Sequence, residues 1–482
     1  MKHSPQKTIV FLVPFLAVFY LIEKLEIDVL SYLERSETVK IAPVWSELND
    51  LDTLLIEELV IDTVVTDSIA VDTIVTDKFS DTLEINPNRW FPKYAVSDLS
   101  TLPDSLKFEG SEIARASLRL FFAKLEAIDT SDTNPIEVFH WGDSQIEGDR
   151  ITGVLRSSWQ KSWGGNGPGL IPAVQPIPAL SIKQRESGSW KRHTRFGKID
   201  STITHNAYGA MAAFSRVKGE GTVTLKPNPA GFKLNKRWGH VKFLIGDAPL
   251  GGNITLKGSA TPYKAFSIRP TRPGMHTSIV SDLTEGEKEL IVGFEGYNIE
   301  VTGIELGSRH GVVMHNIPLR GSAGMIFTKL DRGHLESFME KREVGLMVLQ
   351  FGGNVVPYLK DSADAQKFAK RFRKQLKFLK LIIPEAAVIV IGPSDMGAAG
   401  TYPMLGSVIE NLKEQVILED CMYWDLRRVM GGEGSIERWS NLEPRLASTD
   451  LIHFSPKGAR VVGEKFDEAF RAEYKSWVKW IN

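Results

Sequence analysis

Three short stretches, far apart in the chain, hold residue types that together can cleave an ester. "HWGDSQ" contains Ser144 behind a Gly-Asp pair, and "QFGGN" ends on Asn354. "STDLIH" spaces Asp450 three positions before His453. A serine attacks an ester when a histidine takes its proton, a carboxylate orients that histidine, and N–H donors hold the oxyanion. These stretches therefore predict Ser144 as nucleophile, His453 as base, Asp450 as orienting acid and Asn354 as oxyanion donor.

Each stretch also has an ordinary structural interpretation when it is taken alone. Ser144 would then cap a helix, His453 would be a loop histidine, and Asn354 would be a turn residue after two glycines. The occurrence of all three in one chain, each beside a predicted strand end or helix start, favours the hydrolase. Asp143 is a less suitable triad acid because it is adjacent to Ser144, and we expect it to brace the turn.

The elements around these stretches alternate between strand and helix. A short strand at residues 136–139 precedes Ser144, and the apolar runs "VGLMVLQF" and "AVIVIG" indicate strands buried on both faces. Helical periodicity is found at residues 111–128, 145–163, 365–381 and 456–480. This alternation predicts an α/β fold with a parallel sheet covered by helices on both sides. Ser144 and Asn354 follow strands, at the sheet edge where such folds carry their active sites.

Residues 166–310 lack the alternation of strands and helices and are predicted to form an inserted module. Short strand-like pieces separated by turns predict a β-sandwich. Between positions 181 and 280 there are 17 Lys/Arg and 4 Asp/Glu. Trp190, Arg192 and Trp238 are candidate contacts for an anionic glycan, because sugars stack on indoles and cations bind anions. Two alternatives are tryptophans that belong to a core, and a basic surface that docks the acidic segment described next.

The N-terminal part predicts a membrane attachment. Residues 8–22 are apolar and follow two lysines, which is typical of a signal anchor or a signal peptide within residues 1–25. Residues 26–100 form an acidic stalk or linker, in which Asp-Thr recurs about every ten residues between positions 52 and 82. The predicted location is the periplasm or cell envelope, with the hydrolase outside the cytoplasm.

Composition argues against several other classes. The formal net charge of −1 gives no overall field for nucleic acid. A single cysteine, Cys421, excludes a disulfide within the chain. The histidines of the module are scattered without the paired spacing of a metal site, and no nucleotide-binding fingerprint is found. We therefore expect neither a metal nor a cofactor.

The three stretches resemble blocks of the SGNH (GDSL-type) hydrolases, in which "GDS", "GxN" and "DxxH" recur in this order. The resemblance implies a three-layer, flavodoxin-like parallel sheet made of residues 101–165 and 311–482. It also implies an oxyanion hole formed by the N–H groups of Ser144 and a glycine together with Asn354. "HNIPLRGSAG" matches the glycine block through Gly321, with Gly324 as the competitor. Val355 stands where many members have an acid, which removes a supporting hydrogen bond.

A β-rich insertion between the first and second blocks is similar to that of the peptidoglycan O-acetylesterases, which carry a carbohydrate-binding-like module. This resemblance implies a serine esterase that removes O-acetyl groups from a cell-envelope glycan, with the acetylated glycan as its partner. Two alternatives stay open. The same triad would serve an O-acetyltransferase, and a decayed hydrolase would serve as a glycan-binding protein.

Overall fold

The structure, a computed structural model, describes residues 85–86, 89–95, 97–128, 134–271 and 274–481. All of them belong to one compact unit of the chain. The predicted anchor at residues 8–22 and the acidic repeats lie outside the described residues. Within the described part, no helix is both long and apolar enough to cross a bilayer.

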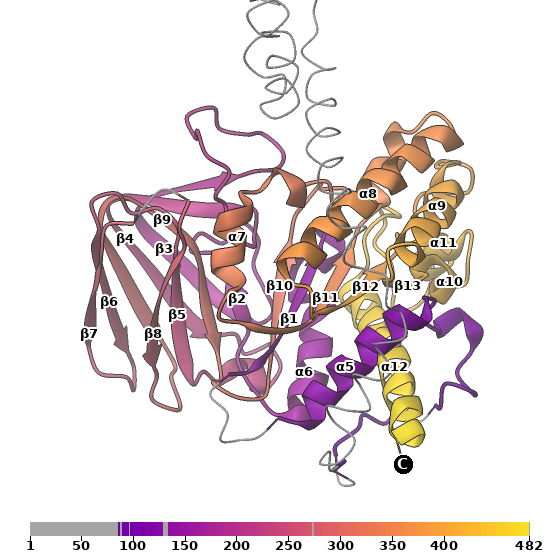
Figure 1. The fold of residues 1–482 in the computed structure, drawn as a ribbon, viewed down its shortest axis with the longest axis horizontal. Helices are drawn as coiled ribbons and strands as arrows, with labels where there is room; N and C mark the ends of the chain where they lie inside the picture. Colours follow the sequence, from indigo (N-terminus) through magenta and orange to yellow (C-terminus); the bar gives the residue numbers. More distant parts are fainter. Residues whose placement is uncertain (1–84, 87–88, 96, 129–133, 272–273, 482) are drawn as a thin grey trace, which may run out of the picture. The chain divides into compact units, whose positions relative to one another are not determined.

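Five parallel strands form the central sheet of the hydrolase part (Figure 1). Their order is β10-β1-β11-β12-β13, so the first strand in sequence lies between the second and the third. This is the flavodoxin-like order, in which the chain changes winding direction beside the first strand. Every residue of β1 is buried, including the polar Glu137 and His140. The strands are β1 (Ile136–Gly142), β10 (Val312–Pro318), β11 (Glu343–Gln350), β12 (Ala387–Ile391) and β13 (Met422–Trp424).

Helices cover both faces of this sheet and make three layers (Figure 1). Alternate strand residues belong to two separate cores, because side chains of a strand point to opposite faces. Phe139 packs into the core beneath one set of helices, and Val138 into the core beneath the other. The first set is α7 (Arg332–Met339), α8 (Ser362–Ile382) and α9 (Leu405–Ile417). The second set is α5 (Glu112–Glu126), α6 (Thr152–Trp163), α10 (Leu426–Met430), α11 (Ser435–Ser440) and α12 (Pro456–Ile481).

The inserted module is antiparallel and has its own apolar core. Its eight strands are connected into one hydrogen-bonded sheet through the long strand β9. One edge of β9 pairs with β4 and β2, while the other pairs with β6 near its start and β5 near its end. The strands are β2 (Gly169–Ile171), β3 (Ile182–Thr194), β4 (Ala213–Pro227), β5 (His240–Ile245), β6 (Gly252–Gly258), β7 (Lys264–Ile268), β8 (Thr277–Asp282) and β9 (Leu290–Gly307).

Two predicted elements differ in the structure. Two of the short strand-like pieces of the module, "ELIVGFEG" (289–296) and "IEVTGIEL" (299–306), form the single strand β9. Within it, Asn298 takes a φ of 57° beside a register shift. The turn-forming residue therefore makes a bulge and does not end the strand. The helix expected at 145–163 is broken, because Glu147 is extended and Gly148 has a φ of 67°. A short 3₁₀ segment, η2 (Ser144–Asp149), precedes α6 as a result.

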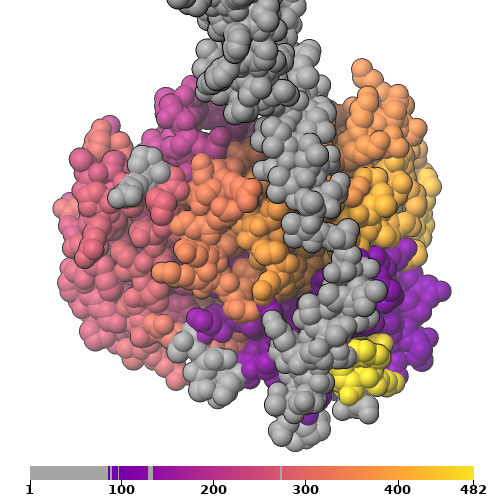
Figure 2. All heavy atoms as spheres, in the orientation of Figure 1, coloured from indigo at the N-terminus to yellow at the C-terminus, as the bar shows by residue number. Residues whose placement is uncertain are grey.

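The module and the hydrolase part pack directly against each other. In the space-filling view the pink atoms of the module adjoin the orange atoms that follow them in sequence (Figure 2). The buried Trp141 of β1 donates its indole N–H to the Ala210 carbonyl oxygen of the module at 2.8 Å. Tyr208 and Phe214 of the module belong to the same core cluster as Trp141. The module is therefore held against the sheet by shared core packing.

Candidate active site

Ser144 is presented at the carboxyl end of β1 by a sharp turn. It begins η2, where the Asp143 carboxylate accepts the Gln145 backbone N–H at 2.9 Å. The Asp143 N–H donates to the Gln350 carbonyl oxygen of the neighbouring strand β11 at 3.1 Å. These two hydrogen bonds show that Asp143 braces the turn, as predicted. Ser144 itself remains partly exposed.

A continuous hydrogen-bonded relay joins serine, histidine and aspartate. Ser144 Oγ lies 2.9 Å from His453 Nε2. His453 Nδ1 lies 2.8 Å from Asp450 Oδ2, and the other carboxylate oxygen accepts the backbone N–H groups of Ile452 and His453. With Nδ1–H donating to the carboxylate, Nε2 is the acceptor for the serine hydroxyl. The arrangement can therefore remove the serine proton during attack on an ester.

The Asp450 carboxylate is kept ionised by its hydrogen bonds. Partial burial would raise its pKa, but the backbone and ring N–H groups of His453 and the N–H of Ile452 lower it below the ordinary value. The side chain is 47 % exposed and that of His453 is 32 % exposed, so the relay lies at the surface. A substrate can therefore reach it without movement of the fold.

Two side chains that the sequence did not single out tie the nucleophile turn to the histidine loop. Gln145 Nε2 donates to the Ile452 carbonyl oxygen at 2.7 Å and to Ser394 Oγ at 3.2 Å. Arg150 donates to the Phe454 carbonyl oxygen at 3.0 Å through one nitrogen and to the Ser144 carbonyl oxygen through another at 3.4 Å. Both follow Ser144 within a few positions, but their acceptors are mostly backbone carbonyls, which leave no pattern in a sequence.

The two predicted oxyanion donors come from loops that follow β10 and β11. Gly321 has a φ of 76° in a turn closed by the Ser322 N–H on the Leu319 carbonyl oxygen at 2.9 Å. The Leu319 N–H donates to the Gly142 carbonyl oxygen, which holds this turn against the end of β1. Asn354 Nδ2 donates to the Ser322 carbonyl oxygen at 3.1 Å. One amide hydrogen of Asn354 thus links the two loops, and the other can serve a ligand.

Gly324, the competing glycine, has a structural role. Its N–H donates to Ser322 Oγ at 3.0 Å. A Cβ at this position would lie 2.7 Å from the Phe372 ring and 2.9 Å from the Phe351 ring, whereas a Cβ on Gly321 would meet no atom within 4 Å. The packing therefore favours Gly321 as the glycine that faces a ligand.

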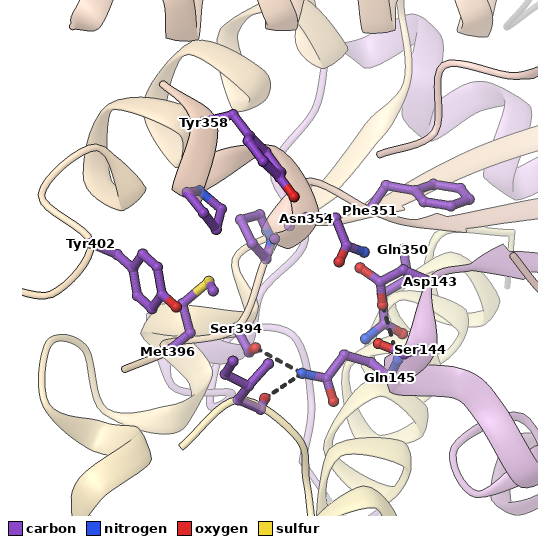
Figure 3. A pocket seen from close by; sticks show the side chains of 15 residues that line it. Asp143, Ser144, Gln145, Gln350, Phe351, Asn354, Tyr358, Ser394, Met396 and Tyr402 are labelled. Atoms are coloured by element: carbon purple, nitrogen blue, oxygen red, sulfur yellow. Dashed lines mark hydrogen bonds between the residues drawn. The ribbon is translucent and has the colours of Figure 1, made fainter. Parts of the chain in front are cut away.

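A small pocket of about 130 Å³ opens beside Ser144. Figure 3 shows Ser144, Asp143 and Gln145 on one side, with Met396 and Tyr402 across from them. It is much smaller than the roughly 300–1,000 Å³ typical of pockets for drug-sized ligands. The remaining lining residues include Gln350, Phe351, Asn354, Tyr358 and Ser394.

Asp143, which lines this pocket, is buried. Burial raises its pKa from 3.8 to about 6, although the Gln145 N–H and the nearby His453 oppose the shift. Burial likewise raises the pKa of Glu147, against the opposing effect of Arg320 and Arg150. The nucleophile turn therefore carries two carboxyl groups that hold protons more tightly than exposed ones.

The three predicted glycan contacts of the module lie in different environments. Trp238 is wrong as a stacking surface, because only 3 % of it is exposed and it belongs to the core of the module. Trp190 is half-buried, packs at 5.5 Å between centroids against Phe294, and donates its N–H to the Ser187 carbonyl oxygen. Arg192 lines a second, larger cavity, described below. Trp238 thus belongs to the core of the module, Trp190 packs partly against that core, and Arg192 is a half-buried residue of the cavity wall.

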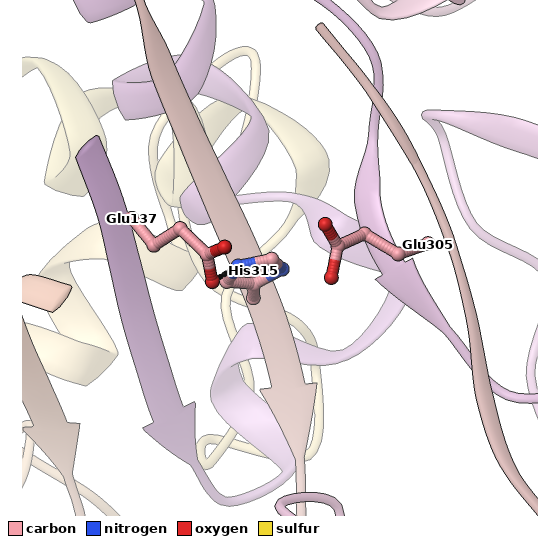
Figure 4. A group of neighbouring side chains, drawn as sticks. All are labelled: Glu137, Glu305 and His315. Atoms are coloured by element: carbon pink, nitrogen blue, oxygen red, sulfur yellow. Dashed lines mark hydrogen bonds and ion pairs between the residues drawn. The ribbon is translucent and has the colours of Figure 1, made fainter. Parts of the chain in front are cut away.

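A buried group of metal-ligand types lies away from Ser144, between the two sheets. Glu137 of β1, His315 of β10 and Glu305 of β9 come within reach of one another (Figure 4). Arg342 donates to both carboxylates, at 2.6 and 2.8 Å, and Lys242 Nζ lies 3.2 Å from Glu305. Arg342 lowers the pKa of both carboxyls despite burial, and Lys242 further lowers that of Glu305. The arrangement is a charge-balanced ion-pair cluster that joins the module to the sheet.

His315 is fully engaged in that cluster. Its Nδ1 accepts the Leu170 N–H at 3.0 Å, so the neutral ring carries its hydrogen on Nε2, which lies 3.1 Å from Glu137. Both ring nitrogens therefore have partners within the described residues.

Comparison with known proteins places the fold. A solved structure of a peptidoglycan O-acetylesterase is similar with a TM-score of 0.56 and 21% sequence identity, over 76% of this chain and 97% of that one. A family two carbohydrate esterase from Cellvibrio japonicus has a TM-score of 0.25 at 7% identity, over 62% of this chain and 99% of that chain. The latter score is too low to carry an argument. No protein-family model and no curated protein matches the sequence. The resemblance predicted from the sequence is thus confirmed at the level of the fold.

Proposed function

We propose that this protein is a serine esterase that removes O-acetyl groups from a cell-envelope polysaccharide, with peptidoglycan as the substrate. The observation that carries the proposal is the relay of Ser144, His453 and Asp450, with successive distances of 2.9 and 2.8 Å. It lies at the carboxyl edge of a parallel sheet whose fold is similar to that of a peptidoglycan O-acetylesterase. Position, chemistry and fold support the same reaction class.

In the first half-reaction Ser144 Oγ attacks the carbonyl carbon of the acetyl ester, and its proton passes to His453 Nε2. The negative charge that develops on the carbonyl oxygen is held by the N–H groups of Ser144 and Gly321 and by Asn354 Nδ2. Asp450 stabilises the imidazolium. The C–O bond to the sugar then breaks, and the sugar oxygen leaves with the proton from His453.

In the second half-reaction a water molecule attacks the acetyl group on Ser144. His453 takes a proton from that water, the oxyanion forms again on the same donors, and the Ser144 oxygen leaves. The imidazolium returns its proton to Ser144 Oγ, and acetate is released. The chain ends the cycle as it began.

The small volume of the Ser144 pocket supports acetyl as the acyl group. A cavity of about 130 Å³ lined by Met396, Tyr402 and Pro357 has room for a short acyl chain. A long acyl chain would need a channel that continues beyond these side chains. The proposed substrate is therefore an acetyl ester on a bulky alcohol that stays outside the pocket.

We also propose that the enzyme works in the periplasm, attached to the inner membrane through residues 8–22. The support for this is the basic, then apolar, start of the sequence. An esterase attached to the membrane would act on the insoluble cell-wall glycan close to where that glycan is synthesised.

The test compares acetate release from O-acetylated peptidoglycan with release from acetylated xylan, using the full chain. We expect faster release from peptidoglycan. Equal or faster release from xylan would contradict the choice of substrate. Acetyl groups found on added oligosaccharide, with little free acetate, would show a transferase in place of an esterase.

A further inference from the structure

A second cavity, of about 450 Å³, lies between the nucleophile turn and the inserted module. One wall begins at Glu147, three residues after Ser144, and includes Arg320, which is adjacent to Gly321. The opposite wall is formed by Arg192 and Lys198, on β3 and the loop that follows it. The volume falls within the range of cavities that enclose small-molecule ligands. The cavity thus adjoins the proposed active site.

Hydrogen bonds between the inserted module and the hydrolase part hold the walls of this cavity together. The Leu180 N–H donates to the Gly148 carbonyl oxygen at 2.9 Å, and the Leu170 N–H donates to His315 Nδ1 at 3.0 Å. The first bond joins the loop before β3 to η2, and the second joins β2 to β10. The cavity is therefore a preformed cleft, which we call the intermodule cleft.

The charges of the intermodule cleft do not cancel. Arg156 forms two hydrogen bonds to Asp149, at 2.6 and 3.0 Å, and Arg320 lies 3.1 Å from Glu147. Within the described residues no carboxylate pairs with the two remaining cations, Arg192 and Lys198. The cleft is lined by four cations and two carboxylates: Arg156, Arg192, Lys198, Arg320, Glu147 and Asp149. Both cations that are left over come from the module.

Arg192 is the more informative of these two cations. Its Nε is buried and has no hydrogen-bond partner among the described residues. Burial is the one cause that shifts its pKa, which is lowered. A buried donor of a charged group without an acceptor is costly, because water cannot replace the missing partner. An acceptor with negative charge supplied by a ligand would remove this cost.

Most of the remaining lining is apolar and suits the faces of sugar rings, and Gln175, Ser181, Thr194 and Asn316 are its uncharged polar members. The apolar members include Phe196, Ile177, Pro176, Met211 and Ile317. Flat apolar surfaces with a few oriented polar groups are the usual composition of such sites. A ligand that matches the intermodule cleft combines ring-shaped apolar faces with at least one anionic group.

We propose that the intermodule cleft binds an oligosaccharide that bears a carboxylate, and that Arg192, assisted by Lys198, recognises this carboxylate. The inference rests on the proposed function, because the bound strand must extend towards Ser144 to present its acetyl ester there. It names the module as the part that selects a carboxylate-bearing glycan over a neutral one. A planar guanidinium suits this task, since it binds a carboxylate through two parallel hydrogen bonds.

The test is a calorimetric measurement of binding to the full chain carrying Ser144→Ala. Three probes of equal sugar length are compared: a neutral N-acetylglucosamine oligomer, an oligomer with lactyl carboxylates on alternate sugars, and the latter with a peptide attached to each lactyl group. We expect the lactyl form to bind at least about 10-fold more tightly than the neutral form. The peptide is attached through the lactyl carboxyl group, which then no longer carries a charge. Weaker binding of the peptide form therefore assigns the recognised carboxylate to the sugar, and equal or tighter binding assigns it to the peptide.

Adding Arg192→Gln should reduce this preference about 10-fold, and Lys198→Gln should reduce it by a smaller factor. Arg185→Gln is the matched control, because Arg185 is an exposed arginine on the same strand β3 outside the cleft, and it should leave the preference intact. Equal affinity for neutral and lactyl probes, or a preference that survives both cleft substitutions together, would overturn the inference. Acetate release by the wild-type chain is measured separately. A chain that binds as described but releases no acetate would contradict the esterase alone.

Discussion

The side chain of Gln145 donates a hydrogen bond of 2.7 Å to the carbonyl oxygen of Ile452, across 307 positions of the sequence. Gln145 follows Ser144, and Ile452 precedes His453. The same side chain also accepts the Phe454 N–H at 3.4 Å. The side-chain amide of Gln145 therefore binds the backbone of the residues on either side of His453. Gln145 acts as a positioning residue for the distance between Ser144 and His453.

Gln145→Ala should lower kcat for p-nitrophenyl acetate by about 10–100-fold with little change in KM, because a small displacement of the base impairs proton transfer. Gln160→Ala is the control, since Gln160 is buried in α6 and bonds backbone carbonyls away from the site. The control should lose stability with kcat intact. Equal losses of kcat in both variants would show that Gln145 acts only on stability.

Asn354→Ala should reduce kcat by about 10²–10³-fold, the usual effect of losing one oxyanion donor. KM should change little, because the donor acts on charge that develops in the transition state. Asn411→Ala removes an amide of α9 that bonds Ser407 within its own helix, and serves as the matched control. Steady-state kinetics of both variants check the assignment, and an unchanged kcat in Asn354→Ala would remove Asn354 from the oxyanion hole.

Asp143→Asn should stabilise the protein more at high pH than at low pH. The pKa of Asp143 is about 6 in the folded chain and 3.8 ordinarily. The folded state thus binds the proton more tightly, and the contribution of Asp143 to stability falls as pH rises between these values. Above about pH 6 the buried carboxylate costs up to about 3 kcal/mol, which the amide avoids. The gain in melting temperature should be larger at about pH 7.5 than at about pH 4.5. A gain independent of pH would contradict the raised pKa.

Arg342→Met should lower the free energy of unfolding by about 3–5 kcal/mol, because two buried carboxylates lose their shared cation. Methionine keeps apolar contact where the guanidinium now lies 4.3 Å from the centre of the Phe338 ring. Arg332→Met is the control, since Arg332 is half exposed and pairs with Glu336 on the surface of α7, and such pairs contribute about 0.5 kcal/mol or less. Denaturant unfolding of both variants measures the difference. Similar losses in the two would mean that the cluster does not join the modules.

The sheet and its helices could be predicted from the sequence because their patterns are local. Apolar runs marked β11 and β12, and Ser111 caps α5 where the periodicity begins. The meeting of Ser144 with His453 could be expected because Ser144 follows a strand and His453 precedes a helix, positions that an α/β fold brings to one edge of its parallel sheet. Their catalytic roles stay predictions until they are measured.

The features that could not be predicted from the sequence depend on contacts between distant segments of the chain. The burial of Trp238 follows from strands that cover it in space, and composition alone cannot distinguish a core indole from an exposed one. The role of Gln145 depends on a backbone carbonyl, which any residue type provides. The balance of Glu137 and Glu305 by Arg342 likewise appears only when β1, β9 and the start of β11 are brought together.

Ser144 is proposed to act as the nucleophile of an acetylesterase. The most direct test is the rate of acetate release from O-acetylated peptidoglycan by Ser144→Ala, with circular dichroism and melting temperature showing that the fold is kept. We expect a rate at least about 10⁴-fold below that of the wild-type chain, because the acyl-enzyme cannot form. Release at the wild-type rate by the folded variant would contradict this role of Ser144.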